Sequence, residues 1–304
     1  MPRMRALLIG AVESSRVALD ALSRSADWTI AAVVTLDDAL SHRHSDFVDL
    51  GGEADSLGCP VIRVGNINAD IALDRIDAVD ADYVFVIGWS QICGSKILDR
   101  WDGRLIGYHP APLPRMRGRA AIPWTIMSGD AISAGTLFWI DGGTDTGAIL
   151  DQQFFHVAPL ETAATLYAKH MRALASMLDR SLPALAHGEV PRIPQEEECA
   201  TWAARRTPQD GRIDWTCPAE TVLRLIRASG RPYPGAWTEA GGASLQIWSA
   251  SVRASGGRHL ARAGQVIQTT AEDFTVMCGG GTALRVTEWT SPDRGPRLNA
   301  FLGD

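Results

Sequence analysis

The first half of the sequence alternates short apolar runs with stretches of helix length, and this alternation constrains the fold more than any other feature. The apolar runs read ALLIG, WTIAAVV, PVIRV, DYVFVIGW and RLIGYH. The first helices are expected at about Ser14–Ser23 and Phe47–Leu57. Strands that alternate with helices in this way form a parallel sheet with right-handed crossovers. We therefore expect an α/β fold with a mostly parallel, Rossmann-like sheet, whose ligands bind beyond the carboxyl ends of the strands.

Two further apolar runs surround a glycine-rich turn. AGTLFWI and AILDQQFFHV flank DGGTDTG, residues Asp141–Gly147, and this arrangement is typical of an antiparallel pair. We expect the pair to be added to the sheet and a long helix to follow it, from about Thr162 to about Ala186.

The pattern changes after this helix. The stretch HGEVPRIPQEEECATWAAR has two prolines and an acidic run but no sustained apolar period, which predicts a linker. After a helix at about Pro218–Ala228, short β-rich runs spaced by glycines indicate a small β-barrel. The predicted organisation is a first domain at residues 1–190, a linker at 191–205 and a second domain at 206–304.

Composition indicates a globular protein. The chain has 304 residues, 46% of them hydrophobic, and a net charge of -6, which suffices for one or two buried cores. The apolar run Ala6–Ile9 near the N-terminus is too short for a signal-peptide core or a membrane span. We read it as a first strand and expect a cytoplasmic protein without a membrane partner.

The cysteines and most of the histidines carry no metal-site pattern. The five cysteines are scattered singly, which fits free thiols in a reducing compartment. The HRH sequence at His42–His44 could bind a metal, but two histidines in a polar stretch are more typical of a solvated loop. We expect no metal.

One histidine and one aspartate are candidates for catalysis. His109 ends a strand at the sheet's carboxyl edge, and Asp145 lies in a turn expected at the same edge. A carboxylate facing an imidazole fixes its tautomer and favours its protonated form. A lone histidine is nevertheless more often structural, and DGGTDTG is rich enough in turn formers to explain Asp145 without any catalytic role.

Other functional patterns are weaker. The single Gly10 after the first strand lacks the G-x-G-x-x-G spacing of dinucleotide sites. The D-T-G tripeptide also occurs in aspartic proteases, but here it occurs once and follows a Gly-Gly turn rather than an apolar strand. The alternation of strands and helices is also foreign to the fold of those proteases, so we set that class aside. Arg115, Arg117 and Arg119 can either clamp a phosphate or carboxylate or belong to a solvated loop, and both interpretations stay open.

Together these residues resemble a known family. HPAPLPRMRGRAAIPWTIMSGD followed by GTLFWIDGGTDTGAIL is similar to the 10-formyltetrahydrofolate-dependent formyltransferases, in which N-x-H-x-S-L-L-P-x-x-R-G precedes G-x-D-x-G-x-D-T-G. The family's catalytic histidine and aspartate are 36 residues apart, as are His109 and Asp145 (145 minus 109 is 36). RTPQDGRIDW, LIRASGRPYPGAWT and LQIWSA resemble the second domain of methionyl-tRNA formyltransferase and of the enzyme that formylates UDP-aminoarabinose. The resemblance covers nearly the whole chain.

The resemblance implies a fold, a reaction and a set of site residues. The fold is a Rossmann-like domain followed by a small OB-like barrel, and the reaction is attack of a primary amine on the formyl carbon of 10-formyltetrahydrofolate, without a metal. His109 and Asp145 become the catalytic residues. The candidate folate-binding residues are Val86, Gly88, Trp89, Ser90, Gln91, Ile92, Leu113, Asp141, Gly142 and Thr144. The candidate acceptor-binding residues are Gly10, Glu13, Ser14, Arg115 and Arg117.

The sequence departs from the family pattern at two positions beside the histidine. The family's catalytic asparagine is replaced by Gly107 and its serine by Ala111. Loss of one oxyanion donor typically costs roughly 2.7 to 4 kcal/mol, so either another donor replaces it or the chemistry has changed. Because strand residues alternate faces, Gly107 and His109 should share a face while Tyr108 points away. We expect protonated His109 to serve as the main oxyanion donor, with Gln91 or Ser90 as helpers.

Several functions remain open at this point. The leading one is N-formylation of a small-molecule amine, first a nucleotide-linked amino sugar and next an amino-acid-derived amine. Methionyl-tRNA formyltransferase needs a basic surface, yet residues from 206 onward carry 11 basic and 9 acidic side chains and the first 205 carry 18 and 26. Hydrolysis of formyl-folate is also open, as is non-catalytic binding of folate or nucleotide. The oligomeric state is open, with a homodimer among the options.

Overall fold

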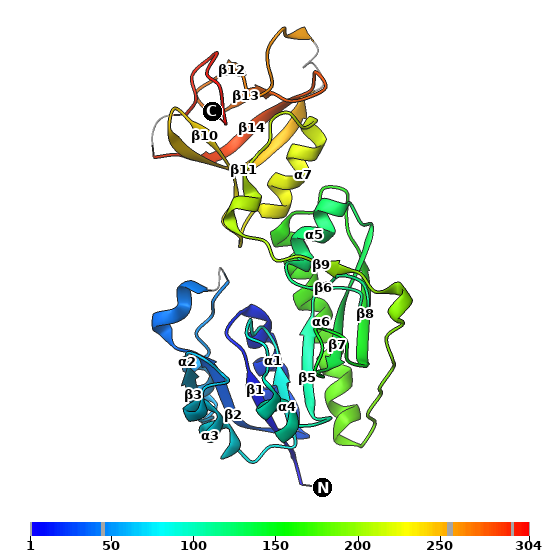
Figure 1. The fold of residues 1–304 in the computed structure, drawn as a ribbon. Helices are drawn as coiled ribbons and strands as arrows, with labels where there is room; N and C mark the ends of the chain where they lie inside the picture. Colours follow the sequence, from blue (N-terminus) through cyan, green and yellow to red (C-terminus); the bar gives the residue numbers. More distant parts are fainter. Residues whose placement is uncertain (1, 44–45, 254–257, 293–294, 304) are drawn as a thin grey trace. The chain divides into compact units, whose positions relative to one another are not determined.

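The computed structural model describes residues 2–43, 46–253, 258–292 and 295–303. The chain forms two compact units (Figure 1). One comprises Met1–Ala121, Ile132–His156 and Tyr167–Ala204, and the other Ile122–Ala131, Val157–Leu166 and Arg205–Asp304. The domain boundaries placed at residues 190 and 206 stay a prediction.

The first unit is built on a seven-stranded sheet in the order β3-β2-β1-β4-β5-β7-β8. Its first five strands are parallel, and β7 and β8 are antiparallel additions beside β5. The predicted mostly parallel sheet and its antiparallel extension are therefore confirmed. The strands are β1 Met4–Ile9, β2 Trp28–Leu36, β3 Val61–Val64, β4 Tyr83–Val86, β5 Leu105–His109, β7 Ile132–Trp139 and β8 Ile149–His156.

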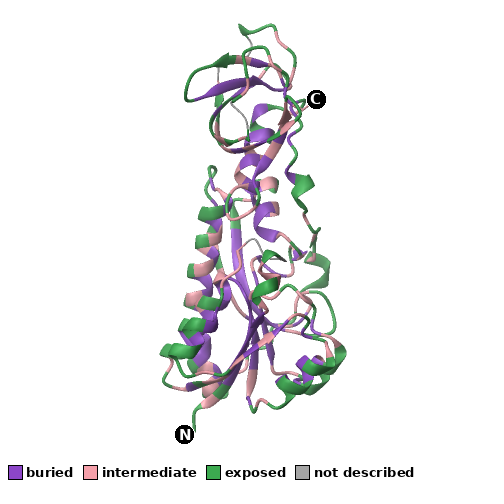
Figure 2. Cartoon of the chain, turned by 90° about the vertical axis from the view of Figure 1, so that its left-hand side faces the viewer, coloured by how far each residue is buried: buried purple, intermediate pink, exposed green. Residues whose placement is uncertain are grey.

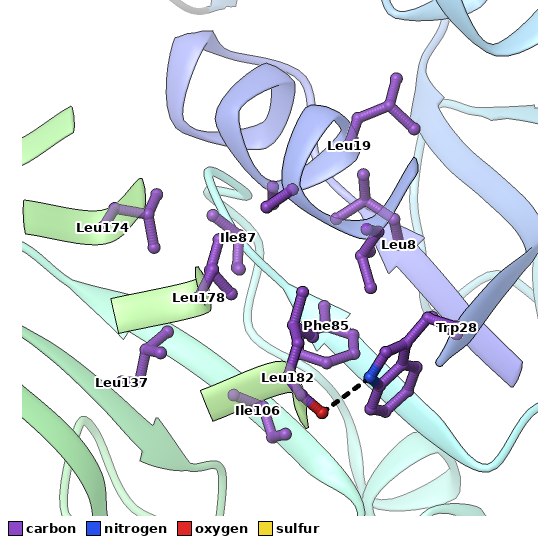
Figure 3. Packing of buried hydrophobic residues seen from close by; sticks show 14 of the residues in the cluster. Leu8, Leu19, Trp28, Phe85, Ile87, Ile106, Leu137, Leu174, Leu178 and Leu182 are labelled. Atoms are coloured by element: carbon purple, nitrogen blue, oxygen red, sulfur yellow. Dashed lines mark hydrogen bonds between the residues drawn. The ribbon is translucent and has the colours of Figure 1, made fainter. Parts of the chain in front are cut away.

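Helices cover both faces of this sheet, so its central strands are buried on both sides (Figure 2). On one face α1 (Glu13–Arg24) and α6 (Ala163–Ala186) pack against the strands. Figure 3 shows Leu19 of α1 and Leu178 of α6 among the sheet residues Phe85 and Ile106. The indole of Trp28 packs in the same layer and donates a hydrogen bond to the Leu182 carbonyl at 2.8 Å.

The opposite face is covered by shorter helices. α3 (Asp70–Asp77) and α4 (Ser95–Arg100) bury Ile76 and Ile97 there, against Leu7 and Ile9 of β1. A 3-10 helix η1 (Asp38–Arg43) and α2 (Gly51–Ser56) lie between β2 and β3 in the chain.

Helix α2 is shorter than the helix expected at Phe47–Leu57. The reason is a local extended pairing, in which Phe47 bridges Val12 and the Val48 amide donates to the Ala11 carbonyl at 2.9 Å. Residues 47 and 48 are therefore committed to the end of β1, beside the predicted site. The long helix expected at about Thr162–Ala186 is confirmed as α6.

The second unit contains a five-stranded antiparallel sheet in the order β10-β11-β14-β13-β12. Helix α7 (Ala219–Ser229) buries Val222 and Ile226 against it. Near the C-terminus, Phe301 bridges Gln265 and Leu302 bridges Ala240, so one segment is paired near both edge strands. The strands are β10 Ala236–Ala240, β11 Ala243–Arg253, β12 Val266–Thr269, β13 Phe274–Met277 and β14 Ala283–Thr290. The second unit also includes most of α5 (Ala121–Ser128) and the 3-10 helix η3 (Pro208–Gly211), whereas the short elements β6 (Arg117–Gly118), η2 (Glu197–Cys199) and β9 (Trp202–Ala203) belong to the first unit.

Two observations on the described residues concern membranes and metals. Among the described helices, none combines the length and the apolar character that crossing a membrane requires. The described residues also include no group of three or more His, Cys, Asp or Glu side chains placed to hold a metal ion. In the HRH stretch, His42 is exposed and His44 lies outside the described residues.

Candidate active site

His109 ends β5 at the carboxyl edge of the first unit's sheet. Its imidazole is almost buried, with a side-chain exposure of 8%, and both ring nitrogens have neighbours. Nε2 lies 2.7 Å from the Met116 carbonyl oxygen. Because a carbonyl only accepts, Nε2 must carry a hydrogen and donate it. Nδ1 is therefore the ring atom left to gain, lose or share a proton.

Asp145 faces that atom. Its Oδ2 lies 3.6 Å from His109 Nδ1, which is beyond the usual 2.7–3.2 Å of an N–H···O hydrogen bond. The same oxygen accepts a 2.8 Å hydrogen bond from the Gly118 amide. The structure thus brings together the two residues predicted to be catalytic and adds Met116 and Gly118 of the intervening loop as their backbone partners.

The turn that carries Asp145 is held in an uncommon conformation. Asp145 has φ 55, a left-handed backbone that costs a non-glycine residue about 1–2 kcal/mol. Asp141 Oδ1 organises the turn by accepting from the Gly143 amide at 3.0 Å and from the Thr146 hydroxyl at 2.7 Å. Glycine is needed at 147, where a Cβ would collide with the Trp139 carbonyl oxygen. These contacts make the predicted folate-pocket residue Asp141 a support of the turn.

The loop after His109 is fixed from β7 and β8. The hydroxyl of Thr136 donates to the Ala111 carbonyl at 2.7 Å, and Gln152 Nε2 donates to the Leu113 carbonyl at 3.0 Å. Gln152 also donates to the Thr136 hydroxyl at 2.8 Å. The family's serine position, Ala111, is fully buried and contributes a carbonyl to this network.

The ends of β1 and β4 approach each other closely, which explains two glycines of the predicted site. A Cβ at Gly10 would collide with the Ile87 carbonyl, and one at Gly88 would collide with Val12 and the hydroxyls of Ser14 and Ser15. The Ala11 amide donates to the Gly88 carbonyl at 3.2 Å. Gly10 and Gly88 therefore allow backbone contact between the two strand ends.

The predicted folate-binding residues differ in exposure. Val86 and Leu113 are buried, whereas Ser90, Ile92, Asp141, Gly142 and Thr144 are exposed or partly exposed. Trp89 is partly buried, and its indole N–H has no partner among the described residues. Gln91 is engaged at both ends of its amide, by the Ile67 amide and the Gly65 carbonyl. It is thus committed to the loop after β3 rather than to an oxyanion.

A cavity of about 620 Å³ lies beside the predicted folate-binding residues 86–92, at the carboxyl ends of β2, β3 and β4. It is lined by Leu40, Gly65, Asn66, Asn68 and Gln91. His109 and Asp145 are not among its lining residues. The structure therefore places a hollow next to the predicted folate-binding residues, with Gln91 common to both.

The predicted acceptor-binding residues differ in their exposure and in their contacts. Arg115 is exposed, while Glu13 is paired with Arg16 at 2.6 Å and Ser14 is buried. Arg117 has only 1% of its surface exposed and forms an ion pair with Glu197 at 2.6 Å. The pKa of Arg117 is raised, chiefly by the hydrogen bond that it donates to Glu197. Its guanidinium is therefore covered and engaged by Glu197 rather than presented to an acceptor.

The space that the family's asparagine would use is filled by side chains of β7 and its continuation. Gly107 is directly opposite Phe138 in the antiparallel register of β5 and β7. A Cβ at Gly107 would lie 2.9 Å from two atoms of the Phe138 ring and 3.0 Å from Ile140. An aromatic ring therefore occupies the place of the missing amide.

Tyr108 points to the other face of the sheet, as the alternation predicted. Its hydroxyl lies 3.1 Å from Nδ1 of His170 on α6 and donates to the His170 carbonyl at 3.2 Å. His170 is fully buried, and its Nε2 has no partner among the described residues. Burial, and secondarily the nearby charge of His109, lower the pKa of His170 to about 3.

This buried histidine predicts acid sensitivity of the first unit. Because the pKa of His170 in the folded chain lies below its ordinary value of 6.5, the unfolded chain binds a proton that the native chain does not between about pH 6.5 and about pH 3. Stability should fall as the pH drops through this window, by about 1.4 kcal/mol per pH unit, and should be unaffected by this group above it. Urea unfolding of His170→Asn at about pH 7.5 and about pH 5 should show a flatter pH dependence, by about 2 kcal/mol.

The matched control for this prediction is His156→Asn, which changes an exposed histidine on β8. It should keep the pH dependence of the unmodified chain. An unfolding free energy of His170→Asn that falls as steeply with pH as that of the unmodified chain would remove His170 as the cause.

One group of site residues carried no local signal in the sequence. Gln195 lies in the stretch predicted to be a linker, yet its Nε2 donates to the carbonyls of Asp145 and Gly147 at 2.8 and 2.7 Å. Short strand β9 of the same stretch pairs with β6, which contains Arg117 and Gly118. The loop that holds His109 and Asp145 is therefore supported from residues about 80 positions later in the chain.

Comparison with known proteins agrees with the fold and the site's motifs. The family model described as formyl transferase matches residues 63–181, and the model described as formyl transferase, C-terminal domain, matches residues 205–297. Together the two matches include His109, Asp145 and most of the second unit.

Three solved structures illustrate the structural similarity. HypX from Aquifex aeolicus in complex with tetrahydrofolic acid is 17% identical, with a TM-score of 0.67; the match covers 96% of this chain and 45% of HypX, so this chain spans less than half of that protein. An N-formyltransferase from Helicobacter canadensis in complex with folinic acid and dTDP-3-aminofucose is 16% identical, covering 94% and 99%, with a TM-score of 0.69. Methionyl-tRNA formyltransferase from Clostridium thermocellum is 19% identical, covering 82% and 93%, with a TM-score of 0.60.

At these identities the three structures establish a shared fold. The two family models establish more, because they match both parts of the chain in the expected order and enclose the motifs around His109 and Asp145. The chain belongs to the formyl transferase family.

Proposed function

We propose that this chain is an N-formyltransferase that moves a formyl group from 10-formyltetrahydrofolate to the primary amine of a small molecule. A nucleotide-linked amino sugar is the leading acceptor and an amino-acid-derived amine the next. The observation that supports this most is the His109–Asp145 pair, whose two members are both held by the three-residue segment 116–118 at the carboxyl edge of the sheet.

The arrangement of His109 suits the demands of amine attack on a formyl carbon. The formyl oxygen gains negative charge as the amine adds, and a donor close to it lowers the barrier. Nε2 is committed to the Met116 carbonyl, so the N–H on Nδ1 is the one that His109 can offer. On this proposal Nδ1 of His109, rather than an asparagine amide, contacts the developing oxyanion.

Asp145 suits the accompanying proton transfer. The attacking amine must lose a proton and the folate nitrogen must gain one, so a group that accepts and returns a proton is needed near His109. Asp145 Oδ2 is 3.6 Å from Nδ1, and the Gly118 amide orients it. We assign Asp145 the roles of orienting the imidazole and of relaying this proton.

The stretch after β4 fits a flat heteroaromatic co-substrate. Ile92 has 77% of its surface exposed, and the Trp89 indole N–H lacks a described partner. The neighbouring cavity of about 620 Å³ is lined by a leucine, a glycine and three amide residues. Apolar surface beside a few directional polar groups is what ring-shaped ligands require. Bound there, 10-formyltetrahydrofolate would supply the formyl group and the leaving nitrogen.

Charge favours a small acceptor over tRNA. The whole chain carries a net charge of -6, whereas tRNA binding relies on cationic side chains that neutralise phosphates. The Helicobacter canadensis neighbour was solved with folinic acid and an amino sugar nucleotide, which supports the same ligand classes here. Exposed Arg115 is the candidate contact for an acceptor phosphate.

A formyl-transfer assay against a panel of amines tests the proposal. The panel contains dTDP-linked and UDP-linked amino sugars, hydroxyornithine and initiator methionyl-tRNA, each with 10-formyltetrahydrofolate, and the products are identified by mass spectrometry. We expect formylation of a nucleotide-linked amino sugar. Formylation of the tRNA alone would establish a methionyl-tRNA formyltransferase, formate release without amine product would establish a hydrolase, and folate binding without turnover would overturn the enzymatic assignment.

A further inference from the structure

The stretch 195–203 is packed along the loop that holds the catalytic pair. β9 runs parallel to β6, and the amides of Arg117 and Arg119 donate to the carbonyls of Thr201 and Ala203 at 2.9 and 3.0 Å. The Thr201 hydroxyl accepts from the Met116 amide at 2.9 Å. Met116 is the residue whose carbonyl accepts from His109. This stretch therefore restrains the His109 partner directly.

Gln195 makes the corresponding contact to the aspartate turn. Both N–H groups of its amide are used, one on the Asp145 carbonyl at 2.8 Å and one on the Gly147 carbonyl at 2.7 Å. Its Oε1 accepts from Nε and Nη2 of Arg117 at 3.1 and 2.9 Å. A flipped amide would set its NH₂ against a guanidinium and its oxygen against two carbonyls, so the chemistry of the neighbours fixes the orientation.

The cation behind Gln195 is itself fixed. Arg117 is 1% exposed and forms a two-pronged pair with Glu197, with Nη1 and Nη2 at 2.9 and 2.6 Å from the carboxylate oxygens. The hydrogen bond from Arg117 lowers the pKa of Glu197. A bidentate pair of this kind fixes the orientation of the guanidinium and also neutralises its charge. The chain of contacts Glu197, Arg117, Gln195 thus ends on the backbone of the catalytic turn.

This turn needs such support. Asp145 adopts a left-handed backbone, which persists in a non-glycine residue only where its surroundings impose it. The Gly118 amide fixes the carboxylate, whereas Gln195 fixes the backbone on both sides of Thr146. The position of Asp145 Oδ2 relative to His109 depends on both.

We propose that Gln195 is a positioning residue for the reaction, which sets the distance between Asp145 and His109 through the Asp145 and Gly147 carbonyls. The inference rests on the proposed function for its kinetic consequence, while the positioning itself is independent of the substrate. A stretch without apolar periodicity thereby becomes part of the active site's framework.

Gln195→Glu is the sharpest test. The carboxylate keeps the contact with Arg117 but replaces two donors by an acceptor that repels both carbonyls. We expect kcat to fall about 10- to 100-fold, because a small misplacement of a catalytic group costs about that much, with KM for the folate within about twofold of the unmodified chain. Gln195→Met, which removes the polar contacts without adding charge, should reduce kcat in the same direction.

Gln153 supplies a matched control. Its amide also lies between an arginine, Arg180 at 3.0 Å, and a carbonyl, that of Phe154 at 3.4 Å, but on β8 and outside this network. Gln153→Glu and Gln153→Met should keep kcat and KM. An equal loss in the Gln153 and Gln195 variants would overturn a specific role for Gln195.

A second readout does not require turnover. The ¹⁵N resonances of the His109 imidazole report its surroundings, and we expect them to move in Gln195→Glu and Gln195→Met but not in the Gln153 variants. If no amine is formylated yet these resonances move, the proposed function fails and the positioning role stands. Unchanged His109 resonances, or a kcat loss matched by a loss of folding stability, would overturn the positioning role.

Discussion

Replacing His109 by asparagine or glutamine is expected to slow formyl transfer by about 10²- to 10⁴-fold while folate binding is largely retained. The two variants remove different halves of the imidazole. Glutamine can place an N–H near the Nε2 position and keep the bond to the Met116 carbonyl, but it leaves nothing at Nδ1. Asparagine places an amide near Nδ1, opposite Asp145, but gives up the Met116 bond.

The comparison separates two roles of Nδ1. If Nδ1 both donates to the oxyanion and exchanges a proton with Asp145, both variants should be slow, with asparagine retaining the donor but not the proton exchange. Stopped-flow rates of single turnover and equilibrium binding of the folate measure the two quantities. A glutamine variant as fast as the unmodified chain would mean that Nδ1 takes no part.

Gly107→Asn is expected to be disruptive, although it restores the residue found in the family pattern. The new Cβ would lie 2.9 Å from the Phe138 ring, so the ring or β5 must move, and overpacking of this kind costs about 1–3 kcal/mol. Activity should fall with it, because Gly107 is two residues from His109 on the same strand face.

A second substitution that makes Phe138 smaller tests whether steric crowding causes the effect of Gly107→Asn. Phe138→Val alone leaves a void, but combined with Gly107→Asn it should recover stability, with a coupling of about 0.5–3 kcal/mol in a double-mutant cycle. Urea unfolding of the four proteins measures it. Additive effects of the two substitutions would show that Phe138 does not occupy the place of the amide.

The sequence predicted those features that depend on local pattern. The alternation of apolar runs and helices was sufficient for the parallel sheet, because the central strands are buried on both faces. The two apolar runs around the turn at residues 141–147 were sufficient for the added antiparallel pair. The spacing between His109 and Asp145, together with the family resemblance, predicted a pair that the structure places 3.6 Å apart. Tyr108 pointing to the opposite face followed from strand alternation alone.

Features that depend on contacts between distant segments could not be predicted in this way. Gln195 lies 50 positions from Asp145 and 78 from Arg117, and nothing in its own surroundings indicates either contact. The filling of the Gly107 space by Phe138 depends on the register of β5 against β7, which a glycine and a phenylalanine do not specify. From the sequence alone, Arg117 could have been a residue that binds an anionic ligand, because its actual partner Glu197 lies 80 positions away in the chain.

The most direct test of the account is a single turnover with 10-formyltetrahydrofolate labelled in the formyl carbon, run with the unmodified chain and with His109→Gln. The acceptor is the amine that the panel assay identifies. The account predicts that the label appears on the amine nitrogen with the unmodified chain, and about 10²- to 10⁴-fold more slowly with His109→Gln at equal folate occupancy. Equal rates of label transfer by the two proteins, or label recovered only as formate, would contradict it.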